Sequence, residues 1–405
     1  MSHLDFADAH RLVGDRAHAL DDTRSRFRRA SRLPAGRYGA VPADRFRAVR
    51  AVGNEVTRLA TFVVEQAGPL TTTQDSGRPG LLRFGIPRSG PVDRLSYEAA
   101  VHCFGAPVVN GAVELSFGGI MLRCTQGEAS FAVCGGGFTV ELDGVQLGSW
   151  VAARICAGMT LRVRPGAGNW SYLSFAGNIV APAWLGSISR HAQAELGGQR
   201  LVAGDVLTIA SCRQLEGSVG DARAVPRPAG VDDPISRARV VLGPQQRFFD
   251  SAAVETLLST SFRPSASFDR MGLVLDGPAI PPIATDMPSE PLLRGALQVN
   301  GEGRTTLLQA DHQTAGGYPK IAMMLGADAD HVAQLPIGRA FQIVALDVVA
   351  ARHAYLAERR AREQYYGLLL QPLDLSARLA NANLIDGAVS ALDTPGEGDA
   401  LICRS

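Results

Sequence analysis

The chain has 405 residues, and its 40 basic and 39 acidic side chains leave a formal net charge of +1. This balance excludes a basic field broad enough to hold nucleic acid or an anionic membrane, so we expect a small molecule or a protein as partner. Lys320 is the one lysine among the basic residues. It excludes biotin attachment elsewhere, and it excludes a P-loop, because Ile321 follows it where Ser or Thr is needed.

The six cysteines lie far apart and form no Cys-x-x-Cys pair, which is typical of a reduced chain without a zinc site. No apolar stretch reaches the roughly 18 residues that a membrane span needs. The N-terminus mixes acids with arginines and has no apolar signal region. We therefore expect a cytoplasmic protein that holds no metal.

Composition and turn residues divide the chain into four parts. Residues 1–60 are rich in arginine, and we expect a flexible, dispensable extension, or a start codon placed too early, rather than a functional arm. Residues 61–228 and 229–350 are two β-rich domains separated by a Pro/Gly-rich connection. Residues 351–405 are expected to be the end of a C-terminal helix and a tail with a cap-like turn near Asn383.

Within the two domains, short β-rich segments alternate with Gly, Pro and Asp turns, which is typical of barrels or sandwiches rather than βαβ units. The strands expected in the first domain are 62–65, 114–122, 130–142, 151–163, 170–175 and 202–209. Those expected in the second are near 240 and at 273–275, 296–299, 305–308 and 341–345. Helices are expected at 95–104, 247–258 and 347–365. The fold class is therefore mainly β with a few helices.

The densest polar cluster of the first domain runs from Gln74 to Gly80 and is followed by Asp93. Its glycines allow close backbone approach to a ligand, and Asp75, Arg78 and Asp93 supply opposite charges. A structural role is also open. Asp75 can cap its own turn, and Arg78 can pair with a carboxylate.

Two shorter clusters lie in the second domain. Arg270 stands between apolar residues just before a strand, where an arginine can clamp a carboxylate or phosphate, or can hold two loops together. Ser289 and Glu290 lie just before the segment that carries Gln298. We regard these four residues as candidate substrate-binding groups.

The richest cluster is the loop 311–320, which carries a carboxylate, an imidazole, an amide, a hydroxyl, a phenol and an ammonium. Such a loop can stabilise a developing oxyanion through Lys320, while Asp311 accepts a proton. In an extended chain His312 and Gln313 point to opposite sides, so the six groups cannot all converge. We assign Asp311, Lys320 and Tyr318 as candidate catalytic residues, and Gln313 to substrate binding.

In this order, the clusters resemble the family known as allophanate hydrolase subunit 2, which includes the C subunit of 5-oxoprolinase and the carboxyltransferase region of urea carboxylase. The matching segments are 73–78, 85–93, 185–187, 269–272, 289–290, 295–298 and 311–320. The chain departs from the family pattern at Ile188, where a charged residue is common, and at Asn178, where a glycine is common.

The resemblance implies a pair of cyclophilin-like β-barrels. It also implies a partner resembling allophanate hydrolase subunit 1, the counterpart of the B subunit of 5-oxoprolinase, and in the 5-oxoprolinase system a third, lactam-hydrolase-like subunit. The leading function is then ATP-dependent opening of 5-oxoproline to glutamate, with ATP bound with or by a partner. Arg78, Arg270 and Lys320 would support the phosphorylated lactam oxygen.

Two alternatives follow from the same resemblance. One is transfer of a carboxyl group to urea or a related amide from carboxybiotin on a separate carrier, since this chain has no attachment lysine of its own. The other is a non-catalytic regulator that binds a kinase-inhibitor-like partner.

Overall fold

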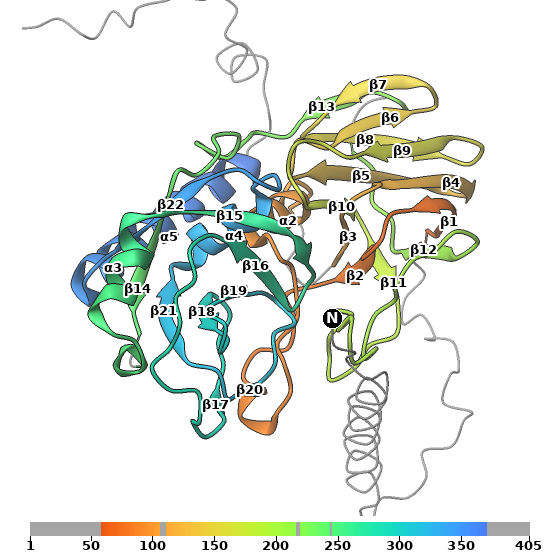
Figure 1. The fold of residues 1–405 in the computed structure, drawn as a ribbon. Helices are drawn as coiled ribbons and strands as arrows, with labels where there is room; N and C mark the ends of the chain where they lie inside the picture. The colour runs from red at the N-terminus through yellow and green to blue at the C-terminus, as the bar shows by residue number, and fades with distance from the viewer. Residues whose placement is uncertain (1–57, 106–110, 216–218, 244, 371–405) are drawn as a thin grey trace, which may run out of the picture. The chain divides into compact units, whose positions relative to one another are not determined.

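The computed structural model describes residues 58–105, 111–215, 219–243 and 245–370. The expected extension up to residue 57 and the expected turn near Asn383 lie outside the described residues. Within them the chain is mostly β, with four α-helices, so the predicted fold class is confirmed (Figure 1).

The first domain contains two sheets that enclose one apolar core. The larger sheet has the order β11-β12-β1-β4-β9-β6-β7, and the smaller has the order β13-β8-β5-β10-β3-β2. Phe62 of β1 and Phe175 of β10 meet inside the core, with ring centroids 5.2 Å apart. The strands are β1 (Ala60–Ala67), β2 (Thr72–Gln74), β3 (Ala112–Leu115), β4 (Ile120–Gln126), β5 (Glu128–Cys134), β6 (Thr139–Leu142), β7 (Val145–Gly148), β8 (Val151–Cys156), β9 (Thr160–Arg164), β10 (Ser171–Phe175), β11 (Asn178–Val180), β12 (Val206–Ala210) and β13 (Ala222–Ala224).

The second domain is a closed barrel with the strand order β14-β21-β18-β19-β16-β15-β22. Strands β14 and β22 pair in parallel, whereas the other barrel ladders are antiparallel. A separate pair, β17 with β20, carries part of the loop 311–320. The strands are β14 (Arg237–Leu242), β15 (Ser261–Phe268), β16 (Gly272–Asp276), β17 (Glu290–Pro291), β18 (Ala296–Val299), β19 (Thr305–Leu308), β20 (Ala315–Gly316), β21 (Lys320–Met324) and β22 (Phe341–Ala345).

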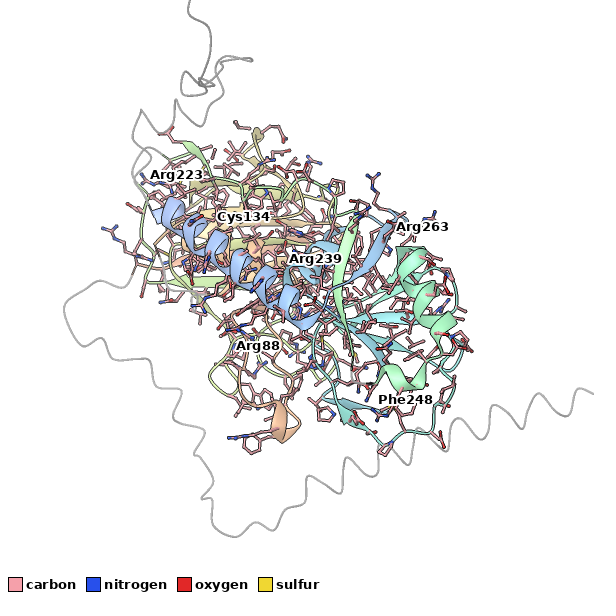
Figure 2. All side chains as sticks on the ribbon, turned by 90° about the vertical axis from the view of Figure 1, so that its left-hand side faces the viewer. Arg88, Cys134, Arg223, Arg239, Phe248 and Arg263 are labelled. Carbon is pink, nitrogen blue, oxygen red and sulfur yellow. The ribbon has the colours of Figure 1, made fainter. Side chains whose placement is uncertain are left out.

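Four α-helices and two short 3-10 helices complete the described part. They are α2 (Arg94–His102), α3 (Ser251–Ser259), α4 (Gly326–Gln334), α5 (Val348–Leu370), η2 (Leu82–Phe84) and η4 (Gln246–Phe248). Figure 2 shows α5 as one long helix across the face of the molecule. Its Arg362 pairs with Glu98 of α2, and its Tyr365 donates to the Pro226 carbonyl at 2.7 Å. Helix α5 therefore packs on the first domain through its C-terminal half.

Three segments that were each expected to form one strand instead form two strands joined by a tight turn. Each of these turns contains glycine in the left-handed region. The breaks fall at Gly119, at the triplet 135–137 and at Gly158. The helix expected at 247–258 also divides, because Asp250 caps α3 by accepting a hydrogen bond from the Ala253 amide. Helix α4 and strands β2, β7, β11, β13, β15, β17, β20 and β21 were not expected.

Gly119 and Gly158 offer a matched test of this geometry. Both have positive φ, +63° and +96°, but a Cβ at Gly119 would lie 1.9 Å from the Val163 carbonyl oxygen, whereas a Cβ at Gly158 meets open space. We expect Gly158→Ala to cost about 1 kcal/mol of unfolding free energy from backbone strain alone. Gly119→Ala should cost about 1 to 3 kcal/mol more. Equal thermal unfolding midpoints for the two variants would contradict the close approach of β4 to β9.

Candidate functional site

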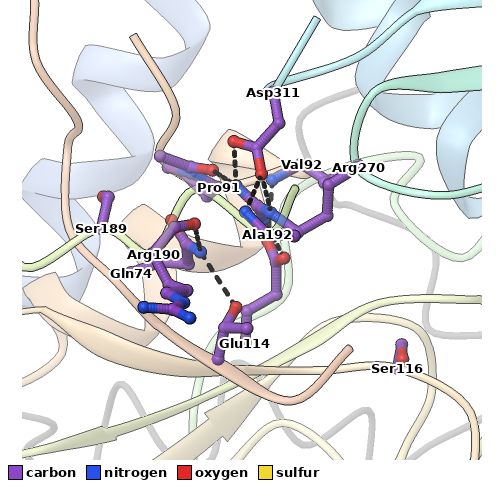
Figure 3. Close-up of polar contacts among 12 residues, drawn as sticks. Gln74, Pro91, Val92, Glu114, Ser116, Ser189, Arg190, Ala192, Arg270 and Asp311 are labelled. Atoms are coloured by element: carbon purple, nitrogen blue, oxygen red, sulfur yellow. Dashed lines mark hydrogen bonds and ion pairs between the residues drawn. The ribbon is translucent and has the colours of Figure 1, made fainter. Parts of the chain in front are cut away.

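A buried ion network joins the two domains (Figure 3). Arg270, in the turn before β16, donates from Nε to Asp311 Oδ2 at 2.9 Å and from Nη2 to Asp311 Oδ1 at 3.1 Å. Its Nη1 pairs with Glu114 of β3, and its Nη2 donates to the Gly90 carbonyl at 2.6 Å. Arg270, Asp311 and Glu114 are fully buried. Arg270 thus holds two loops together, one of the two roles that the sequence left open for it.

The two carboxylates of this network have further donors. Glu114 Oε2 accepts from the Val92 amide and from the Tyr172 hydroxyl, both at 2.8 Å, and Asp311 Oδ2 accepts from the Ala192 amide at 2.9 Å. Burial alone would raise the pKa of Asp311, but the charge of Arg270 outweighs it and holds that pKa below its ordinary value. Asp311 is therefore ionised at neutral pH, with both oxygens engaged.

Asp75 joins two loops of the first domain. Its Oδ1 accepts from the Gly77 amide at 2.9 Å and from the hydroxyls of Ser187 and Ser189, both at 2.6 Å. Its Oδ2 accepts from the Ile188 amide at 2.8 Å. Ile188 makes this hydrogen bond to Asp75 through its backbone N–H. The bond therefore does not depend on the side chain at position 188, where the sequence departs from the family pattern. Asp75 therefore fixes the loop 185–190 against the segment that carries Arg78.

A cavity of about 430 Å³ lies between the two domains and is lined largely by the segment 76–98 on one side and by barrel loops and the start of α4 on the other. Four side-chain atoms of its lining residues are buried and have no hydrogen-bond partner among the described residues: Arg78 Nη1, Ser89 Oγ, Glu98 Oε2 and Arg294 Nε. Buried polar groups normally find partners, so the unpaired groups make this cavity a candidate ligand site. We call it the interdomain cavity. Its charged lining residues are Arg78, Arg88, Arg94, Glu98 and Arg294.

Arg78 is the most deeply placed of these cations, with 2% of its surface exposed. Its Nε donates to the Trp184 carbonyl at 3.0 Å, its Nη2 donates to the Ser189 carbonyl at 2.5 Å, and the guanidinium lies 5.0 Å from the Trp184 ring centroid. Burial lowers the pKa of Arg78, although the charges of Asp75 and Asp311 oppose this. No carboxylate of the described residues lies within ion-pair distance of Arg78, so its charge is not neutralised by a direct ion pair.

His312 adds a neutral imidazole to the lining of the cavity. Burial lowers the pKa of His312, so the ring is uncharged at neutral pH. Its Nδ1 lies 2.6 Å from the Gln313 carbonyl oxygen, and this contact assigns the proton to Nδ1 and leaves Nε2 as an acceptor. His312 therefore has the tautomer that can take a proton from a bound ligand.

The loop 311–320 divides between two places. Asp311 and His312 turn toward the ion network and the interdomain cavity, whereas Gln313 and Tyr318 line a separate hollow of about 540 Å³ with Gln298. The expectation that its groups cannot all converge is confirmed. The hollow is the second place where the structure gathers predicted site residues.

The remaining candidates lie elsewhere. Lys320 begins β21, with Nζ 3.9 Å from Glu290 Oε2, and burial lowers its pKa although the charge of Glu290 opposes this. Ser289 is exposed. Asp93 caps α2 by accepting from the Ser96 amide at 3.1 Å, and it lines a different cavity of about 410 Å³. The interdomain cavity therefore collects Arg78 alone from the predicted set.

Sequence reasoning missed Arg88, Arg94, Glu98 and Arg294. The first three follow the predicted Asp75–Arg78 cluster within 20 residues, and Arg94 and Glu98 stand at i and i+4 on a helix that was expected. That spacing indicates a shared helix face. It does not indicate that the face borders a second domain, and Arg294 had no local signal at all.

In the part of the chain that the structure describes, no group of three His, Cys, Asp or Glu side chains could hold a metal ion, and the five described cysteines are free. None of the described helices combines the length and apolarity that crossing a membrane requires.

Residues 84–345 match the family model of the carboxyltransferase domain, subdomain A and B. The C subunit of 5-oxoprolinase from Escherichia coli is 30% identical over 306 residues, which is 74% of this chain and 96% of that protein. The urea amidolyase of Saccharomyces cerevisiae is 27% identical over 76% of this chain, which corresponds to 18% of the yeast protein.

The solved structures agree with these relatives. The urea carboxylase of Kluyveromyces lactis is 25% identical with a TM-score of 0.66, and the match covers 82% of this chain and 31% of that one. This chain spans between 20% and 57% of the solved chains that it resembles at this level. The chain therefore belongs to the carboxyltransferase-domain family, subdomains A and B, that includes the C subunit of 5-oxoprolinase and a region of the urea amidolyases.

Proposed function

We propose that the chain is a subunit of a cytoplasmic, ATP-dependent 5-oxoprolinase-type complex that opens 5-oxoproline to glutamate. The relatives support this proposal by how much of their length the chain matches. It matches nearly the whole length of the E. coli C subunit but less than a fifth of the yeast urea amidolyase. The observation that carries the proposal is the buried Arg78, whose Nη1 has no partner within the described residues and borders the interdomain cavity.

The chemistry of the substrate fits this cavity. 5-Oxoproline carries a carboxylate, and activation of its lactam oxygen by phosphorylation adds negative charge, so fixed cations would favour both. Arg78 and Arg88 supply that charge at the cavity. The neutral His312, whose Nε2 is left as an acceptor, would take up the proton when a nucleophile attacks the lactam carbon.

ATP would be bound with or by partner subunits, resembling allophanate hydrolase subunit 1 and a lactam hydrolase, because the one lysine of this chain lies outside any P-loop. In this proposal Arg270 and Asp311 position the two domains around the cavity. Tyr318 and Gln298 would serve a step at the separate hollow, which they line, and Lys320 would act beside it, because Lys320 pairs with Gln298 between β21 and β18.

The test is co-expression of the chain with candidate partner subunits, followed by measurement of 5-oxoproline-dependent ATP hydrolysis and of glutamate formation. We expect both activities in equal amounts with all subunits present. The matched control omits this chain and should lose them. Turnover that is unchanged without this chain, or ATP hydrolysis that ignores 5-oxoproline in the complete complex, would contradict the proposal.

A second candidate function is carboxyl transfer to urea or a related amide, favoured by the match of residues 84–345 to the carboxyltransferase model. The same cations would bind the carboxylate delivered by carboxybiotin on a separate carrier protein, which supplies the carboxyl group. Transfer of labelled carboxyl from such a carrier to urea would separate the two functions, because 5-oxoproline opening requires no carrier.

A further inference from the structure

We propose that the interdomain cavity binds an oxyanion together with one proton, and that the proton is taken up by Glu98 of α2. The inference deepens the proposed function, on which it rests for the identity of the natural anion. The binding site itself depends only on the residues that line the cavity.

Glu98 stands one helical turn after Arg94, and both side chains line the cavity. The Glu98 side chain is 22% exposed, so it is reachable from the cavity although largely removed from solvent. Its Oε2 is buried and accepts no hydrogen bond from the described residues, and Nη1 of Arg362 lies 3.4 Å away. A carboxylate in this position is incompletely compensated.

The neighbouring cations are largely engaged by other carboxylates. Arg94 pairs at 3.0 Å with Asp330 of α4, to which Arg294 also binds, and Arg362 of α5 is shared with Glu358 at 3.2 Å. The other charged groups that face Glu98 are Asp93 on its own helix and Arg88 on the preceding loop.

The ionisation of Glu98 agrees with this environment. Burial raises the pKa of Glu98 to about 7, although the charges of Arg362 and Arg94 oppose it. The carboxyl group is thus close to half protonated at neutral pH.

An anion held by Arg78 and Arg88 would share a small cavity with Glu98. An ionised Glu98 repels it, whereas the neutral acid does not and can donate a hydrogen bond. Binding therefore favours the protonated form and draws one proton from solvent onto the Glu98 carboxylate; no covalent bond to the ligand forms or breaks. By linkage, the affinity must fall as the pH rises above the pKa of the free protein.

The experiment uses calorimetric titration of the purified chain, and of the co-purified complex, from pH 6 to 9 in buffers of different ionisation enthalpy. The probes are sulfate and 5-oxoproline, which keep their charge over this range, and 2-pyrrolidinone, the same lactam without a carboxylate. We expect both anions to bind with proton uptake near pH 8, with affinity falling by up to about tenfold per pH unit above pH 7. We expect 2-pyrrolidinone to bind at least tenfold more weakly than 5-oxoproline.

Glu98→Gln should bind the anions with nearly pH-independent affinity and without proton uptake. Its matched control, Glu363→Gln on the exposed part of α5, should keep the wild-type pH dependence. Arg78→Ala should weaken anion binding by about 10-fold to 150-fold. If the wild-type chain and complex bind these anions without proton uptake, or bind none of them, the inference is wrong, whatever the stability of the variants.

The two proposals fail separately. Proton-linked binding of sulfate without binding of 5-oxoproline would support a phosphate-like ligand for the cavity and would count against the proposed substrate. A complex that hydrolyses ATP in response to 5-oxoproline while taking up no proton would overturn the role of Glu98 and leave the proposed function standing.

Discussion

Replacing Arg270 by methionine should lower the free energy of unfolding by about 3 to 5 kcal/mol, because it leaves two fully buried carboxylates without their cation. Glu114 and Asp311 would then face each other inside the junction between the domains. The loss is measured by denaturant and thermal unfolding. The matched control is Arg263→Met on the exposed face of β15, which should change stability by no more than about 0.5 kcal/mol.

A further variant distinguishes whether Arg270→Met loses stability through unpaired charge or through lost hydrogen bonds. Adding Asp311→Asn and Glu114→Gln to Arg270→Met removes the uncompensated charges, so the triple variant should recover part of the lost stability. A triple variant less stable than Arg270→Met would attribute the loss to hydrogen bonds instead. An Arg270→Met chain as stable as wild type would show that the network does not hold the domains together.

The contribution of Asp311 to stability should change with pH in opposite directions in the wild type and in Arg270→Met. A carboxyl group whose pKa is lowered by folding stabilises above its unfolded pKa, and this stabilisation is lost as the pH falls through its folded pKa. Without Arg270, burial is opposed only by His191 and the Ala192 amide, so we expect the pKa of Asp311 to rise and the group to destabilise the fold at higher pH. The deficit of Arg270→Met relative to wild type should therefore shrink as the pH falls from 8 toward 5.

Local signals predicted the parts of the fold that depend on local chemistry. Helix α2 was expected, and its cap Asp93 precedes an apolar pattern that the structure buries. Helix α4 was missed because it begins after Leu325, which supplies no side-chain cap, and with Gly326, so the usual start signal is absent. The break at Gly118 and Gly119 was missed although a Gly-Gly pair is a turn signal, because apolar residues flank the pair and favoured a single strand.

The site was only partly predictable because its decisive contacts are long-range. Arg270 and Asp311 were both singled out, but their partner Glu114 lies in the other domain and read as an ordinary strand residue. Glu98 lies within the helix expected at 95–104, but no local signal singled it out. Arg78 was predicted from its glycine-rich turn, but the property that matters, an Nη1 without a partner in the described structure, depends on how the loop 185–190 occupies its other donors.

Arg78→Ala should reduce the kcat/KM of the reconstituted complex for 5-oxoproline by about 10-fold to 150-fold, the equivalent of about 1.5 to 3 kcal/mol for a hydrogen bond to a charged group. The loss should fall mainly on KM if Arg78 binds the substrate carboxylate, which is charged before and after activation. Arg78→Lys keeps the charge and loses the planar fork, so it should lie between alanine and wild type. The matched control is Arg83→Ala on the exposed helix η2, which should leave kinetics unchanged.

The same assay decides between the two places where the structure gathers predicted residues. If the loop 311–320 acts at the separate hollow, Lys320→Ala should abolish turnover while its substrate affinity remains, whereas Arg78→Ala acts on affinity. Because Arg78 also ties down the Trp184 and Ser189 carbonyls, unfolding midpoints must accompany the kinetics. A large fall in kcat at unchanged KM for a stably folded Arg78→Ala would contradict carboxylate binding by Arg78, since a group that binds ground and transition states equally affects KM alone.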